Sequence, residues 1–149
     1  MDEQILREIF SEGMPPFREW EEFRTYVLRT YPILIQNARE RRLITYSEIA
    51  NQIGLPFNEW FPLKIGAIVG ACSCYEHREG RPLISSIVIN GETCRPGNGY
   101  WGLPGIPSDL VRRGAIGSVD EGGWTGRHWE FWVNEVNRVF EYWMEMGQI

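Results

Sequence analysis

Six apolar residues near the C-terminus recur at alternating spacings of three and four. The spacing predicts an amphipathic C-terminal helix, because residues three and four apart share one face of a helix. The six form an a/d seam: Trp129, Trp132, Val136, Val139, Trp143 and Met146. Because the seam spans fewer than three heptads, it favours packing on the chain's own core over a homodimer formed through the C-terminal helix.

The N-terminal quarter shows three further helical patterns. Apolar spacing predicts helices over residues 2–12 and 18–30. A third helix is expected over 33–42, restarting after Pro32, because proline lacks an amide donor and disfavours the helical conformation in the residue before it.

The middle of the chain has the start and stop signals of a helix-turn-helix. Thr45 followed three residues later by Glu48 is a capping box, which predicts a helix over 46–53 ending at Gly54. A loop and a second helix over 63–75 follow. That second helix has small residues on part of its surface.

The next segment is predicted to be extended. Leu43-Ile44 is expected to form a brief strand, and the β-branched run 82–90 a longer one, closed by a turn at Asn90-Gly91. Residues 94–103 are expected to form a wing-like loop leading to a second short strand. Residues 115–126 contain four glycines and are expected to be a loop.

Together these elements predict an α+β fold: a helix-rich domain with a winged helix-turn-helix-like core and a small β-hairpin or sheet. A length of 149 residues fits one domain. N-terminal helices would occupy residues 1–31, the winged-helix-like core 32–103, and a loop with the amphipathic helix 104–149.

Composition narrows the environment and the partners. Three cysteines do not suggest a disulfide framework. The sequence opens without a signal peptide, and no apolar run approaches the ~18 residues that span a bilayer. These features predict a cytoplasmic protein without a membrane partner. The net charge of −5 argues mildly against nonspecific nucleic-acid binding, although the middle of the chain is less acidic than its flanks.

Three short stretches are similar to a known family. ITYSEIA at 44–50, VGA at 69–71 and PLISSIV at 82–88 resemble the C-terminal winged-helix domain of O6-alkylguanine-DNA alkyltransferases and alkyltransferase-like proteins. The resemblance covers about 60 residues and implies a DNA-associated fold. Residues 74–90 and 96–101 also look like a stretch of uncharacterised bacterial and phage proteins, which implies no activity.

The resemblance also implies which reaction is missing. The family's target-phosphate tyrosine falls on Tyr46 and the glycine of its recognition helix on Gly70. Its arginine finger falls near Ala67, so it is absent. Its nucleophilic cysteine falls on Ser86, and its histidine on Ile87. A serine without an adjoining base cannot replace a thiolate, so we reject alkyl transfer.

Ten residues are candidates for contacting nucleic acid, from the two helices, the cations and the wing. They are Tyr46, Ser47, Lys64, Gly70, Ser73, Arg78, Arg81, Arg95, Asn98 and Tyr100. Nearby acids such as Glu40, Glu76 and Glu79 could equally pair with the arginines. For Gly97–Trp101 we favour a tight turn with its two aromatic residues in the core over a binding loop.

Metal and catalytic alternatives have less support. Cys72, Cys74, His77 and Cys94 could be imagined as zinc ligands, but cysteines two apart on a helix point in different directions. A nuclease cluster of Glu76, Glu79 and Glu92 with Asp109 or Asp120 lacks an accompanying lysine motif. Both histidines, His77 and His128, are expected at the surface. We therefore expect no metal and no cofactor.

Three hypotheses for function follow in order. The first is a non-catalytic winged-helix module that binds DNA. The second is a protein-interaction or assembly module of a bacterial or phage system. The third is an unrecognised enzyme, which a pocket gathering Glu76, His77 and Arg81 would favour.

Overall fold

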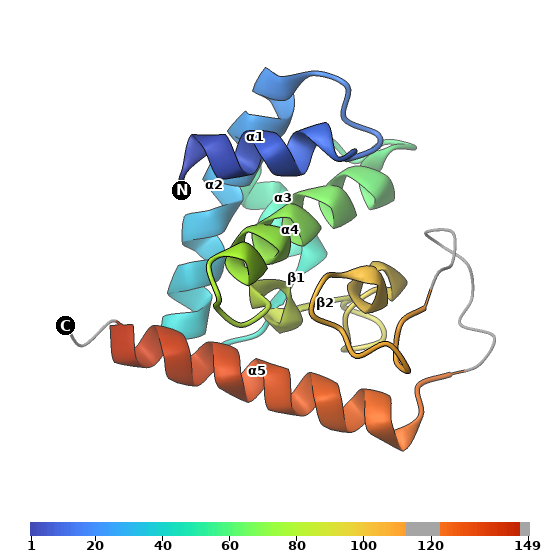
Figure 1. The fold of residues 1–149 in the computed structure, drawn as a ribbon. Helices are drawn as coiled ribbons and strands as arrows, with labels where there is room; N and C mark the ends of the chain where they lie inside the picture. The colour runs from blue at the N-terminus through green and yellow to red at the C-terminus, as the bar shows by residue number, and fades with distance from the viewer. Residues whose placement is uncertain (113–122, 147–149) are drawn as a thin grey trace.

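The computed structural model describes residues 1–112 and 123–146 (Figure 1). The helices are α1 (Glu3–Ser11), α2 (Trp20–Arg39), α3 (Tyr46–Ile53), α4 (Phe61–Arg78) and α5 (Gly126–Met146). The described residues also form two short strands, β1 (Ile44–Thr45) and β2 (Val88–Ile89). Two 3-10 segments are present as well, η1 (Ile84–Ile87) and η2 (Asn98–Gly102). The predicted helix-rich α+β class is confirmed. Most of the loop predicted over 115–126 lies outside the described residues.

A single helix replaces the two that were expected around Pro32. Helix α2 runs through this proline without a break, so the predicted restart is wrong. Pro32 is on the exposed side, where water can reach a carbonyl that loses its amide partner. On the other side, Phe23, Val27 and Leu34 are fully buried in one continuous stripe. Burial of that stripe holds the helix together across the proline.

The predicted helix-turn-helix pair is present and its boundaries have local causes. Thr45 Oγ1 accepts a hydrogen bond from the Glu48 amide at 3.1 Å, which caps α3. Gly54 ends the helix with φ +75°, a conformation that glycine adopts without strain. Helix α4 is longer than predicted at both ends.

The strand predicted over 82–90 is wrong in its first half. Residues 84–87 form η1, and only Val88–Ile89 are extended. They pair in parallel with Ile44 and Thr45, so the sheet is not the expected hairpin. The pairing is short because Thr45 is already the cap of α3. The turn at Asn90 is present, with its amide donating to the Arg95 carbonyl at 2.9 Å, but η2 follows in place of a second wing strand.

Helix α4 lies at the centre of the fold, packed against α1, α2 and η1 (Figure 1). Its residues Ile65, Ile68 and Cys72 are buried. Helix α5 crosses below the other helices and contacts α2 and η1. The middle of the α5 seam cannot pack against a second copy of the chain, because Trp132, Val139 and Trp143 are already buried within this one. The interpretation that this helix packs on its own core is therefore confirmed.

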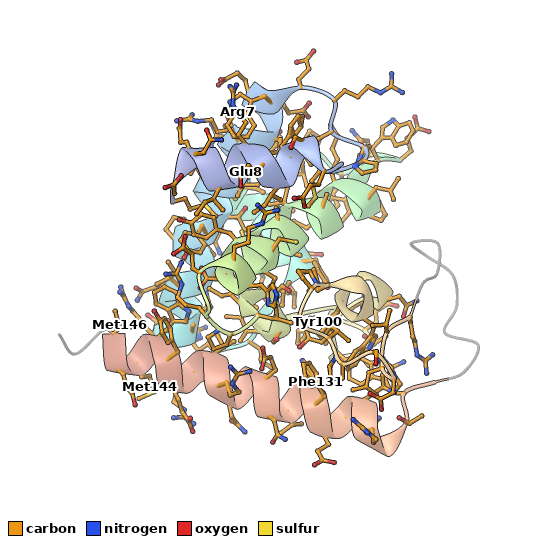
Figure 2. All side chains as sticks on the ribbon, viewed as in Figure 1. Arg7, Glu8, Tyr100, Phe131, Met144 and Met146 are labelled. Atoms are coloured by element: carbon orange, nitrogen blue, oxygen red, sulfur yellow. The ribbon has the colours of Figure 1, made fainter. Side chains whose placement is uncertain are left out.

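A second, smaller aromatic core lies against the first half of α5. It is centred on Trp101, which is fully buried and touches the rings of Trp124 and His128 at centroid distances of 5.1 and 4.6 Å. Phe131 extends from α5 toward the η2 segment that carries Tyr100 (Figure 2). Tyr100 and Trp101 are buried, which confirms the interpretation of Gly97–Trp101 as a structural turn.

A buried carboxylate joins the end of α4 to α2 and to the connection that follows α4. Glu76 has no exposed surface. Arg81 Nε donates to Glu76 Oε2 at 2.7 Å, and the Tyr31 hydroxyl also donates to this carboxylate. Burial is the largest single effect and opposes the charged form of Arg81, but the hydrogen bond to Glu76 and the negative charge of Glu76, with smaller contributions from nearby tyrosines, together outweigh it and raise the Arg81 pKa. For Tyr31, burial and the Glu76 hydrogen bond together raise the pKa.

Membrane insertion gains no support from the helices. Within the ranges the structure describes, none has the length and apolar character needed to cross a bilayer.

Replacing Glu76 with glutamine should destabilise the fold strongly. The substitution keeps the shape of the side chain but leaves Arg81 without its counter-charge, and breaking a buried ion pair costs about 3–5 kcal/mol. The free energy of unfolding in urea measures the loss. Glu79→Gln is the matched control, because Glu79 is an exposed neighbour on the same turn. Equal stability of the two variants would show that the Glu76 network does not hold the fold.

Candidate functional site

Two of the ten residues predicted to contact nucleic acid are inside the protein. Ser73 is fully buried, and its hydroxyl donates to Ser85 Oγ at 2.6 Å. Tyr100 is also buried, with its hydroxyl 2.7 Å from Ser86 Oγ. Burial of both side chains contradicts their prediction as nucleic-acid contacts, and for Tyr100 it agrees with the core position that the sequence favoured for the 97–101 turn. Each hydroxyl is used to satisfy a buried polar neighbour, which is the usual requirement for polar groups in a core.

Three of the predicted phosphate-binding cations are paired with acids instead. Lys64 Nζ is 2.6 Å from Glu22 Oε1 and lies over the ring of Phe17. Arg78 pairs with Glu8 and Glu12 of α1. The third is Arg81, held by Glu76. These pairs tie α4 and its following connection to α1 and α2, so their charge is largely compensated within the chain.

Of the other candidates, Tyr46 lies beside Gly97, the residue before Asn98. The Gly97 amide donates to the Tyr46 hydroxyl at 2.9 Å; burial raises the Tyr46 pKa, and this hydrogen bond opposes the rise. Ser47 is exposed. The Arg95 guanidinium lies 4.8 Å from the ring centre of Trp124 and 5.7 Å from that of Trp129.

The last two candidates, Gly70 and Asn98, are both partly buried. A Cβ at Gly70 would touch the Leu103 side chain at 3.7 Å. From Leu63 to Glu76, a stretch described in full, no residue is exposed. The expected docking face of α4 is therefore only partly covered: Ala67 and Gly70 are partly buried, and a Cβ at Gly66 would meet open space.

The position matched to the family's nucleophile is also inaccessible. Ser86 is fully buried, its hydroxyl is bonded to Tyr100, and its carbonyl accepts from the Trp132 indole at 2.9 Å. Burial raises the pKa of Tyr100, so this phenol is no base for the serine. The geometry agrees with the rejection of alkyl transfer from the sequence.

The histidines and cysteines separate in space. His128 was predicted at the surface but is buried, with its ring nitrogens near the Leu110 carbonyl and Thr125. His77 is exposed, as predicted. Cys72 is buried, Cys74 is partly buried and Cys94 is exposed. Among the described residues, no three histidine, cysteine or acidic side chains are placed to hold a metal ion.

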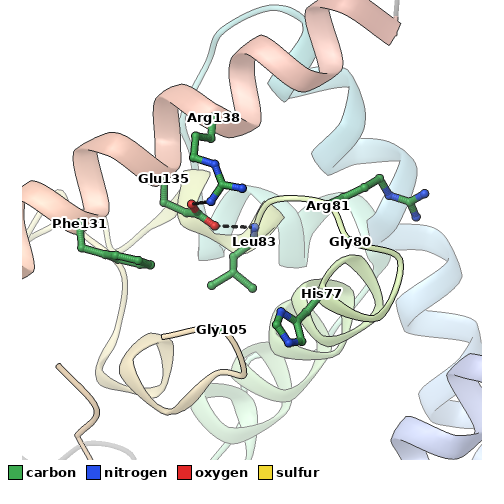
Figure 3. Close-up of a pocket in the computed structure, with 8 residues that line it drawn as sticks. All are labelled: His77, Gly80, Arg81, Leu83, Gly105, Phe131, Glu135 and Arg138. Carbon is green, nitrogen blue, oxygen red and sulfur yellow. Dashed lines mark hydrogen bonds and ion pairs between the residues drawn. The ribbon is translucent and has the colours of Figure 1, made fainter. Parts of the chain in front are cut away.

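A cavity of about 310 Å³ opens between the end of α4 and the middle of α5 (Figure 3). Glu135 and Arg138 reach into it from α5, and His77 lies on the opposite side. Glu135 is buried; its carboxylate accepts from the Leu83 amide at 2.9 Å and from Arg138 at 2.5 Å. Of the trio that would have favoured an enzyme, His77 and Arg81 line the cavity, whereas Glu76 does not.

Two exposed aromatic side chains stand apart from this cavity, on the loop between α3 and α4. Phe57 is 60% exposed and Trp60 is 49% exposed. Phe57 stacks on Phe61 with a ring separation of 4.4 Å. We call the pair Phe57 and Trp60 the aromatic corner. Sequence inspection missed it because the burial of two aromatic residues in a proline-flanked loop depends on tertiary packing.

Comparisons with known proteins add no relative: no protein-family model, no curated protein and no solved structure matches this chain.

The three thiols should react in an order set by their burial. Cys94 should be alkylated first. Burial raises the pKa of Cys74 to about 11, so its reactive thiolate is scarce at pH 8. Cys72 should react last, because burial both covers it and raises its pKa. Iodoacetamide labelling followed by peptide mass spectrometry measures the order.

A Ser86→Cys variant extends the same labelling experiment to the position of the family's nucleophile. Its new thiol should be as protected as Cys72, and labelling in denaturant supplies the control. Rapid labelling at position 86 in the folded protein would contradict the buried placement of this segment.

Proposed function

We propose that this chain is a non-catalytic protein-interaction module built on a divergent winged-helix-like core at residues 32–103. Support for the core comes from the pair of helices α3, which Thr45 caps, and α4, and from the return of the chain beside β1 through β2. Its divergence lies in the parallel pairing and in η2, which stands where a second wing strand was expected.

The observation that carries the proposal is the aromatic corner. Large aromatic side chains dominate protein interfaces because they bury much area and lose few rotamers on binding. Here the loop is already ordered: Asn58 Oδ1 accepts from the Trp60 amide at 2.9 Å, and the Asn58 carbonyl accepts from the Phe61 amide at 3.1 Å. A partner would therefore meet a preformed surface rather than a loop that must be ordered first.

The charges near the aromatic corner favour a protein partner over a nucleic acid. Residues 43–63 contain two acids, Glu48 and Glu59, and neither lysine nor arginine. The next cation, Lys64, is paired with Glu22. Because binding to nucleic acid depends chiefly on cations that contact phosphates, the segment 43–63 itself lacks the main source of affinity. Arg29 of α2 is near it, with its guanidinium donating to the Ile53 carbonyl at 3.1 Å.

DNA association through the residues named in the sequence remains a prediction with weaker geometric support. The third hypothesis, an enzyme, also stays open, but the cavity beside His77 contains no hydroxyl or thiol nucleophile among its lining residues.

Replacing Trp60 with serine should abolish capture of the partner while leaving the fold intact. Loss of a central aromatic contact typically costs 2 kcal/mol or more, which is roughly a thirtyfold loss of affinity. The wild-type chain, carrying an affinity tag and bound to resin, is compared with Trp60→Ser in a lysate of its own cells. Proteins are quantified by mass spectrometry.

Val133→Ser is the matched control for this experiment, since Val133 is equally exposed, at 49%, but lies on α5. Partner recovery that is the same for both variants would contradict the proposal. So would salt-sensitive binding of duplex DNA in a fluorescence anisotropy assay that Trp60→Ser leaves unchanged.

A further inference from the structure

The cavity between α4 and α5 has features that the proposed interaction surface does not explain. Its wall combines the half-buried ring of Phe131 and the Leu83 side chain with four polar or charged groups, from His77, Arg81, Glu135 and Arg138. At about 310 Å³ it is near the lower end of the range for small-molecule sites, roughly 300–1,000 Å³. Its size therefore suits a compact ligand.

Hydrogen-bond donors in the cavity outnumber the acceptors that remain available. Glu135 is the one carboxylate in the lining, and each of its oxygens already accepts a hydrogen bond from Leu83 or Arg138. Arg138 uses one N–H group for that bond, although a guanidinium has five, and its side chain is 61% exposed. The His77 ring makes no hydrogen bond within the described part of the chain. A ligand that accepts hydrogen bonds from Arg138 and His77 would supply the acceptors that the lining residues lack.

The arrangement of these groups is fixed before any ligand arrives. Gly105 has φ +88°, and a Cβ there would lie 2.9 Å from His77 Nδ1, so only glycine leaves room for this position of the imidazole. The connection between Gly80 and Leu83 is held by Glu76 through Arg81 and by Glu135 through the Leu83 amide. The Arg81 guanidinium turns away from the cavity toward Glu76, so it adds positive charge without competing for the ligand (Figure 3).

We propose that this cavity binds a small aromatic anion, an aromatic carboxylate or aryl phosphate, with its anionic group on Arg138 and His77 and its planar ring against Phe131. The anionic group would replace water around the exposed part of Arg138 by charge-assisted hydrogen bonds. The ring would cover the apolar face of Phe131, which also borders an adjoining hollow lined by Arg127, Glu130 and Asn134. Neither step requires Glu135 to release its two donors.

The test uses benzoate and phenyl phosphate as probes with the full-length chain. Titration followed by amide chemical shifts should show saturable binding, with the shifts concentrated at Gly80, Arg81, Leu83 and Gly105. Arg138→Gln should weaken both probes at least about tenfold, the usual effect of losing a charge-assisted contact. Phe131→Leu should weaken phenyl phosphate but leave the weaker binding of inorganic phosphate unchanged.

Arg42→Gln is the matched control. Arg42 lines neither this cavity nor the adjoining hollow, is 69% exposed and also pairs with one acid, Glu40. Its replacement should change the affinity of either probe less than about twofold. Arg138→Lys keeps the charge and should bind more tightly than Arg138→Gln, which separates loss of the site from loss of the fold.

Absence of saturation with both probes would overturn the proposal, and so would equal weakening by Arg42→Gln and Arg138→Gln. Neither result would bear on the aromatic corner, because neither arginine is part of it.

Discussion

The buried Glu76 carboxylate is the constraint on which the rest of this fold depends. A charged group without any exposed surface is tolerated only when it is paired and hydrogen-bonded, and here Arg81 and Tyr31 supply both conditions. Tyr31 belongs to α2, Glu76 to α4, and Arg81 to the connection that leads into η1. One ion pair therefore determines how the two longest helices of the first half meet and where the chain turns after α4.

This constraint explains why α4 is a core helix rather than an exposed recognition helix. Its end is held against α2 by Glu76, and its start by the pair Lys64 and Glu22. Helix α1 covers another side through Arg78, whose partners are Glu8 and Glu12. Of the small residues of α4 that suggested a docking surface, Gly70 lies next to the Leu103 side chain, and Gly66 faces open space. The resemblance to DNA-repair proteins thus predicts the order of α3 and α4 along the chain. It does not predict that α4 packs mainly in the core.

Local signals predicted the elements whose causes are local. Thr45 and Gly54 define α3 by capping and by backbone conformation, and the spacing from Trp129 to Met146 defines α5. The failures have tertiary causes. Pro32 does not break α2 because a buried stripe on the opposite side continues through it. Residues 84–87 look like a strand, but β1 offers only two partners before α3 begins.

The candidate surfaces were harder to predict than the fold. His77 and Arg138 are 61 residues apart in sequence, and nothing in their local patterns indicates that they line one cavity. Glu135 lies at the edge of the apolar seam, three residues after Trp132 and four before Val139, but its sequence position does not reveal that its carboxylate accepts from the Leu83 amide. Exposure of Phe57 and Trp60 is likewise a result of packing, since an aromatic side chain in a loop is as often covered as open.

The two candidate surfaces lie at opposite ends of one rigid element. Helix α4 has 18 residues, which at 1.5 Å per residue is about 27 Å. The aromatic corner adjoins its first turn, and His77 of the cavity is in its last. Sites separated by more than about 10 Å that share no partner are energetically independent, so occupancy of one surface need not alter the other. The Glu76 network lies at the cavity end, where it holds the 80–83 connection. Loosening that network would therefore disturb the cavity before it reached the corner, and the two surfaces can be separated by experiment even though one helix carries both.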